Sequence, residues 1–263
     1  MTVEKAFARA AEENRGVLVG YLPAGFPTFE DSKEALRVLV DSGIDLIEVG
    51  LPYSDPVMDG PAIQRAAVDA LAGGFRTKDV FDLVETVSDR VPVAVMTYWN
   101  LVERYGVGAF AADFAGVGGA GLITPDLIPE EAGEWVAASD EQGLDRIFLV
   151  APSSTDQRVR ETVELCRGFV YAQSVMGVTG ARDQVSSVAP ALVERTRKHT
   201  DLPIGVGLGV KERSQATEIA SYADAVIVGS AMVNCYLRSD STAEGHRALA
   251  KLTEELAAGV RDK

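Results

Sequence analysis

The sequence predicts an α/β protein that folds as a single (β/α)8 TIM barrel with an extra helix at its N-terminus. Two observations carry this prediction: apolar, β-branched runs alternate with segments of helical period, and the runs are almost continuously apolar, as in parallel strands covered on both faces. The length agrees, because 263 residues lie close to the roughly 250 of such a barrel. No linker or low-complexity tract divides residues 1–263, so we expect one domain.

The expected elements follow an amphipathic N-terminal segment, MTVEKAFARAAEENRG, which predicts a short helix. Eight runs are expected to be strands, at residues 17–22, 45–49, 93–98, 121–124, 146–150, 169–173, 204–207 and 225–228. Helices are expected at residues 30–42, 62–71, 79–89, 107–115, 130–141, 157–166, 187–199, 212–222 and 243–260. An open, doubly wound sheet is the alternative, but the sequence after the first strand, PAGFPT, lacks its G-x-G-x-x-G fingerprint.

Composition argues against several classes of partner. The formal net charge of -14 gives a surface that repels phosphate backbones, so we expect no nucleic-acid partner. No run approaches roughly 18 apolar residues and the N-terminal segment lacks the apolar core of a signal peptide, so we expect no membrane span. The two cysteines, Cys166 and Cys235, lie far apart and outside any C-x-x-C pattern, which fits a reducing, cytoplasmic location.

One expected strand, residues 45–49, carries an acid at Glu48. In a barrel of this class the active site lies at the C-terminal ends of the strands. An ionised carboxylate in a core strand is costly unless it is paired or used. Glu48 could point outward or cap a neighbouring helix. Alternatively, it could face the barrel interior as a catalytic acid or base whose pKa is raised by burial.

The loop after this strand holds two more acids, Asp55 and Asp59. Asp59 precedes Gly60 and Pro61, and proline often opens a helix, so Asp59 could be a turn or N-cap residue. Two acids leaving one strand could also meet in a single pocket, where one delivers a proton and the other holds a developing positive charge. Asp55 is interpreted as a loop-shaping or contact residue.

Three glycine-containing stretches predict a phosphate site. GVTGAR (177–182), GVGLG (205–209) and VGSA (228–231) each follow an expected strand. Barrels commonly bind phosphate with the loops after strands seven and eight and with the N-terminus of a short helix. Glycine lets backbone N–H groups approach the anion, and Ser230 can add a hydroxyl donor. We therefore expect a small, phosphate-bearing substrate.

The sequence offers few other groups for catalysis. The only histidines, His199 and His246, lie on expected helices, and no His, Cys or Asp cluster has metal-ligand spacing, so no metal is expected. None of the lysines lies in an expected strand, so a Schiff-base lysine in the barrel is not indicated. Carbon–carbon chemistry here would depend on acid–base catalysis alone.

The stretch IEVGLPYSDPVMDGPAIQ resembles the signature E-[LV]-G-[IV]-P-[FY]-S-D-P-x-x-D-G-P-x-I-Q of the tryptophan synthase alpha chain family. MTYWNLV, ITPDLIPEEA, IFLVAPSST, GVTGAR and GVGLGV…VIVGSA resemble later motifs of that family, in the same order. The resemblance implies an α/β barrel that cleaves indole-3-glycerol phosphate into indole and glyceraldehyde 3-phosphate. It also implies a beta chain partner in an α2β2 tetramer. Pyridoxal phosphate would belong to that partner, with no cofactor in this chain.

Carried over position by position, the resemblance implies roles for individual residues. Glu48 would be the catalytic acid/base, Asp59 would stabilise the protonated indole, and Tyr171 would help to orient Glu48. The resemblance further implies a phosphate cradle of Gly180, Gly209, Gly229 and Ser230, an indole pocket of Tyr21, Met96, Tyr98, Ile123 and Leu208, a closing loop with Thr179, and a beta chain surface around Asp55.

Three positions depart from the commoner family pattern, namely Phe26, Ala120 and Leu208, and these put pocket shape and loop packing in question. Both carboxylate positions are intact. Two other functions remain open: another phosphate-binding barrel enzyme, which would lack the paired Glu48 and Asp59 motif, or a barrel kept mainly as an allosteric partner, which would be expected to have lost one of the acids.

Overall fold

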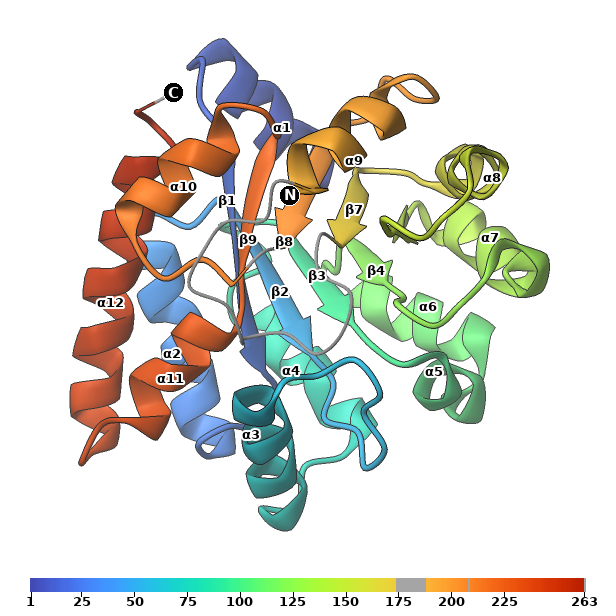
Figure 1. The fold of residues 1–263 in the computed structure, drawn as a ribbon. Coiled ribbons are helices and arrows are strands. Elements are labelled where there is room, and N and C mark those ends of the chain that lie inside the picture. Colours follow the sequence, from blue (N-terminus) through green and yellow to red (C-terminus); the bar gives the residue numbers. More distant parts are fainter. Residues whose placement is uncertain (174–187, 208, 263) are drawn as a thin grey trace.

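The strands form one parallel sheet that curls into a barrel surrounded by helices (Figure 1). The computed structural model describes residues 1–173, 188–207 and 209–262. The strand order is β5-β4-β3-β2-β1-β9-β8-β7-β6. The bounds are β1 (Val17–Pro23), β2 (Leu46–Gly50), β3 (Val93–Met96), β4 (Gly121–Ile123), β5 (Asp145–Ile147), β6 (Leu149–Val150), β7 (Val170–Gln173), β8 (Ile204–Gly207) and β9 (Ala225–Val228).

The expected strand 146–150 is divided into β5 and β6 by Phe148. β5 pairs with β4, and β6 pairs with β7. The chain itself joins the two ends of the sheet at this point: Thr124 N donates to the carbonyl of Ile147 at 3.2 Å, and Tyr171 N donates to that of Phe148 at 3.1 Å. The nine segments therefore act as the eight strands of a barrel, which confirms the predicted fold class.

Most helices lie where the periodicity placed them, within a few residues. Their bounds are α1 (Val3–Glu12), α2 (Phe29–Asp41), α3 (Pro61–Ala72), α4 (Val80–Glu85), α5 (Trp99–Tyr105), α6 (Val107–Gly116), α7 (Gly133–Gln142), α8 (Asp156–Leu165), α9 (Val188–Arg197), α10 (Arg213–Ala220), α11 (Ser230–Leu237) and α12 (Thr242–Gly259), with single 3₁₀ turns at Thr77–Asp79 and Pro129–Glu131. α5 and α11 were not predicted from the sequence; they are 7 and 8 residues long, and helices this short give a weak periodic signal.

Local chemistry explains where several helices start. Thr28, Thr155 and Ser241 cap α2, α8 and α12, each accepting a hydrogen bond from a backbone N–H of the first turn. Pro61 opens α3 at a position where its missing N–H costs nothing. No helix in the described ranges is long and apolar enough to cross a membrane.

Helix α1 closes the N-terminal end of the barrel. Val3, Phe7 and Ala10 of this helix belong to the same buried apolar cluster as interior strand residues such as Val17 and Phe169. The rings of Phe7 and Phe169 lie 5.6 Å apart. The predicted N-terminal helix is thus present, and its apolar face fills one mouth of the barrel. Substrate access is left to the opposite, C-terminal mouth.

A buried ion pair ties this closed end together. Asp45, just before β2, accepts hydrogen bonds from Arg15 Nη1 at 2.7 Å and Nη2 at 2.9 Å. Arg9 of α1 adds a third contact at 2.8 Å, and the backbone N–H of Leu18 adds a fourth at 3.0 Å. The charge of Asp45 is therefore compensated from α1, from the segment after it and from β1.

Candidate active site

Glu48 faces the interior of the barrel. Its neighbours Ile47 and Val49 belong to the outer core, between the strands and the helices, whereas Leu46 belongs to the interior cluster. Successive side chains of a strand point to opposite faces, so Glu48 shares the interior face with Leu46. This arrangement excludes the outward-pointing and helix-capping alternatives for Glu48. In register, Glu48 lies beside Tyr21 of β1 and Ala94 of β3.

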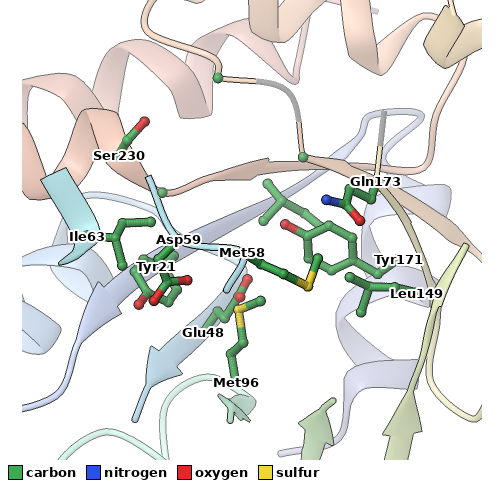
Figure 2. A pocket seen from close by; sticks show the side chains of 14 residues that line it. Tyr21, Glu48, Met58, Asp59, Ile63, Met96, Leu149, Tyr171, Gln173 and Ser230 are labelled. Carbon is green, nitrogen blue, oxygen red and sulfur yellow. The ribbon is translucent and has the colours of Figure 1, made fainter. Parts of the chain in front are cut away.

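A cavity lies above Glu48, at the C-terminal ends of the strands. Its lining consists of Tyr21, Glu48, Met58, Asp59, Ile63, Met96, Leu149, Tyr171, Gln173, Gly207, Gly209, Ile227, Gly229 and Ser230. Figure 2 shows Tyr21 and Asp59 on one side of this cavity and Tyr171 and Gln173 across it, with Glu48 between the two groups. The lining is thus largely apolar, with two carboxylates and a few hydroxyl and amide groups.

The carboxyl group of Glu48 is buried with little compensation. Only 1% of the residue is exposed, and Oε2 has no hydrogen-bond partner among the residues that the structure describes. Burial raises the pKa of Glu48 to about 8, with a further contribution from the negative charge of Asp59. At neutral pH the group is therefore mostly protonated, and it has a proton to deliver.

Asp59 reaches the same cavity from the loop between β2 and α3. The N-cap of α3 is Gly60 and not Asp59, so the capping alternative for Asp59 is not realised. Burial raises the pKa of Asp59, while a hydrogen bond from Tyr98 lowers it. That bond joins Tyr98 Oη to Asp59 Oδ1 at 3.4 Å. The two acids therefore share one pocket, and at Asp59 a hydrogen bond opposes the effect of burial.

Two glycines make room for the tyrosines of the site. A Cβ on Gly50 would lie 2.2 Å from the hydroxyl of Tyr21, and a Cβ on Gly207 would lie 2.4 Å from that of Tyr171. Each tyrosine therefore occupies space that a side chain on the adjacent strand would fill. Burial, together with the charge of Glu48, raises the pKa of both hydroxyls well above the usual range, so both stay protonated.

Glycines and a short helix form one side of the cavity. Gly209, with a φ of 59°, follows β8, and Gly229 follows β9 directly. Ser230 is the first residue of α11 and lines the cavity. A helix that begins at the cavity directs its N-terminal end toward a bound anion, as expected for a phosphate site. Three predicted site residues, Thr179, Gly180 and Leu208, lie outside the described residues.

The other predicted residues take different places. Met96 lines the cavity, and the Tyr98 hydroxyl contacts Asp59 at its edge. Ile123 is fully buried in the interior cluster and is not among the lining residues. Asp55 is exposed in the loop, where its carboxylate accepts a hydrogen bond from Ser54. The described residues contain no group of three or more His, Cys, Asp or Glu that could hold a metal ion.

Several lining residues were missed by the sequence analysis: Met58, Ile63, Leu149, Gln173, Gly207 and Ile227. Gln173 had a detectable signal, since it lies two residues after Tyr171 in β7 and so shares its face of the sheet. Leu149 had none, because only the pairing of Leu149 with Tyr171 places it beside the pocket.

This fold and site define an α/β barrel enzyme of the acid–base type: two carboxylates with raised pKa values face one cavity, beside the glycine-lined ends of β8 and β9. The family model described as tryptophan synthase alpha chain matches residues 7–261. The chain belongs to the tryptophan synthase alpha chain family.

Individual relatives agree with this assignment. The chain is 61% identical to a tryptophan synthase alpha chain of Salinispora arenicola, over 97% of this chain and 96% of the relative. It is 59% identical to one of Mycobacterium marinum, over 98% and 94% of the two chains. Among solved structures, a tryptophan synthase of Mycobacterium tuberculosis matches with a TM-score of 0.93 and 56% identity, covering 98% of both chains.

Proposed function

We propose that Glu48 and Asp59 divide the acid–base work of the family reaction in this chain. As a tryptophan synthase alpha chain, the protein is a lyase that cleaves indole-3-glycerol phosphate to indole and glyceraldehyde 3-phosphate. One observation carries the assignment: the Glu48 carboxyl is buried, one of its oxygens has no partner among the described residues, and it shares its cavity with a second acid, Asp59. Such a pair suits a reaction that needs a neutral acid and an anion together.

In the proposed sequence of proton transfers, Glu48 starts protonated and gives its proton to C3 of the indole ring. The Asp59 carboxylate accepts a hydrogen bond from the ring N–H and stabilises the positive charge. The Glu48 carboxylate then takes the proton of the hydroxyl on the adjacent side-chain carbon. The carbon–carbon bond breaks, its electron pair returns to the ring, and the aldehyde forms. One proton has moved from the hydroxyl to C3, and Glu48 ends protonated, as it began.

The other residues of the site would bind the substrate or orient Glu48. Tyr171, across the cavity from Asp59, would orient Glu48. The substrate phosphate would lie against Gly209, Gly229 and Ser230, with Gly180 completing the cradle. The residues that we propose for binding the indole ring are Tyr21, Met96, Tyr98, Ile123 and Leu208. Closure would involve the segment that contains Thr179. The apolar lining supports a planar aromatic ligand.

The partner is proposed to be a tryptophan synthase beta chain, in an α2β2 tetramer. Support comes from membership of the tryptophan synthase alpha chain family and from the exposure of Asp55 and Val57 in the loop beside the site. We propose no cofactor for this chain, with pyridoxal phosphate restricted to the beta chain. A cytoplasmic location is supported by Cys166 and Cys235, neither of which forms a disulfide.

The assignment is tested by measuring indole release from indole-3-glycerol phosphate across pH, for the wild type and Glu48→Gln, alone and with a beta chain. We expect slow wild-type turnover that rises with the partner and falls above about pH 8, as Glu48 loses its proton. The amide cannot transfer the proton, so turnover should fall by about 10²- to 10⁴-fold in both settings.

Other outcomes would redirect the assignment. A wild-type rate that keeps rising beyond pH 9 would show that Glu48 starts as the ionised base. An active Glu48→Gln would move the chemistry to another residue. No indole release, even with the partner, would leave the barrel a regulatory subunit or an enzyme for a different phosphate ester.

A further inference from the structure

A pair of tyrosines holds the loop that carries Asp59. Tyr53 belongs to this loop, Leu51–Gly60, and Tyr98 immediately precedes α5. Their rings lie 5.2 Å apart at an interplanar angle of 32°. The side-chain amide of Asn100 donates a hydrogen bond to the hydroxyl of Tyr53 at 3.2 Å. The loop is therefore fastened to α5 by one ring contact and one polar contact.

The hydroxyl of Tyr98 contacts two adjoining residues of the loop. It accepts a hydrogen bond from the backbone N–H of Met58 at 3.0 Å and lies 3.4 Å from Asp59 Oδ1, to which it donates. A tyrosine hydroxyl can do both, because it carries one proton and two lone pairs. The contact to Met58 has ordinary length and the contact to Asp59 is long, so the first fixes the backbone and the second can adjust when substrate binds.

The position of these contacts matters because the middle of the loop is exposed. Asp55 and Val57 face solvent, whereas Met58 and Asp59 line the cavity. The loop thus turns inward within one or two residues, and Tyr98 contacts it at that turn. Burial raises the pKa of Tyr98 to about 12, so its hydroxyl remains a donor throughout the working range of the enzyme.

We propose that Tyr98 is the positioning residue for Asp59 and that Tyr53 and Asn100 in turn hold Tyr98 in place. The inference rests on the proposed role of Asp59 and deepens it. Tyr98 contributes in two ways: it aims the carboxylate into the cavity, and its hydrogen bond favours the ionised form of Asp59 against the burial that opposes it. Only the ionised form can stabilise a protonated indole.

The test uses three tyrosine-to-phenylalanine variants, assayed with a beta chain present. Tyr98→Phe keeps the ring and removes the hydroxyl. Tyr53→Phe removes the group that Asn100 contacts. Tyr105→Phe is the matched control, because its hydroxyl donates to Asp113 at 2.6 Å from the far end of α5, outside the cavity. The readouts are kcat, KM and the pH dependence of indole release.

For Tyr98→Phe we expect kcat to fall about tenfold with little change in KM, as for loss of a hydrogen bond to a charged group. The acidic limb of the pH profile of kcat should move to higher pH in this variant, because Asp59 loses the hydrogen bond that lowers its pKa. Tyr53→Phe should lower kcat by about threefold or less and move the acidic limb in the same direction as Tyr98→Phe does. Tyr105→Phe should change neither kcat nor the acidic limb.

A Tyr98→Phe variant with raised KM and an unmoved acidic limb would overturn the proposal, since Tyr98 would then only line the ring pocket. Asp59→Asn separates the two levels of inference. If Asp59→Asn is inactive and Tyr98→Phe behaves like the wild type, only the positioning role fails. If Asp59→Asn keeps full activity, the proposed role of Asp59 fails first.

Discussion

Two buried acids lie three residues apart, Asp45 just before β2 and Glu48 within it, and the structure stabilises them in different ways. Asp45 and Glu48 are each 1% exposed. Asp45, at the closed end of the barrel, accepts hydrogen bonds from two arginines and a backbone N–H. Glu48, at the open end, has an oxygen without a partner in the described part of the chain, and its pKa is raised to about 8.

The difference shows that burial does not by itself identify a catalytic acid. The free-energy cost of burying a carboxylate is offset at Asp45 by arginine side chains and a backbone N–H donor. At Glu48 the cost is avoided because the group keeps its proton. A buried carboxylate is costly unless it is paired or used, and Asp45 is the paired case. What separates the two is whether partners from other elements reach the carboxylate.

The largest expected effect on stability is at the closed end. Asp45→Asn leaves Arg15, whose side chain is only 3% exposed, without its buried counter-charge. We expect the free energy of unfolding to fall by about 3 kcal/mol, measured from the urea midpoint, with kcat of the folded protein nearly unchanged. Glu48→Gln, three residues further along the chain, is the matched control, and at neutral pH it should not destabilise the protein. A loss below about 1 kcal/mol for Asp45→Asn would contradict the structural role of the pair.

The next largest expected effect is the pH dependence of the free energy of unfolding that Glu48 causes. The folded pKa of Glu48 is about 8 and the ordinary value is 4.5, so between these limits the folded state holds a proton that the unfolded state has lost. Wild-type stability should therefore fall as pH rises from 4.5 to 8.

Glu48→Gln lacks this titration. The free energy of unfolding of this variant should equal that of the wild type below about pH 4.5 and exceed it by a few kcal/mol above about pH 8. Urea unfolding across that pH range measures the difference. A pH-independent difference between the two proteins would show that the Glu48 carboxyl does not keep its proton on folding.

The smallest effect concerns the packing of α1. Phe7→Leu keeps an apolar side chain but loses the ring contact with Phe169. We expect a loss of about 1 kcal/mol in the free energy of unfolding and no change in kcat or its pH profile. A change in the pH profile would show that the two ends of the barrel are coupled through the interior cluster.

Much of the fold was predictable from sequence because its signals are local. The alternation of apolar runs and helical segments placed every barrel strand, and residues 204–207 and 225–228 agree with β8 and β9 without adjustment. The division of residues 145–150 at Phe148 was not predictable, since it arises where the sheet closes on itself. Short helices such as α5 were missed for lack of a periodic signal.

The residues of the candidate site were also predictable only in part. Glu48 and Asp59 were named from their place in one strand and its loop, and both line the cavity. Met58 and Leu149 were missed, because nothing in their local sequence marks them as lining residues.

The sequence by itself determined the class of fold, the two acids and the glycine-lined strand ends, because each depends on the order of residues along one strand and its loop. Only the tertiary structure decided which buried acid keeps its proton and which is neutralised. The arginines of Asp45 come from α1 and the segment after it, and Tyr98 reaches Asp59 from the end of another strand. Electrostatic partners in a barrel are set by neighbours in space, and these come from distant parts of the chain.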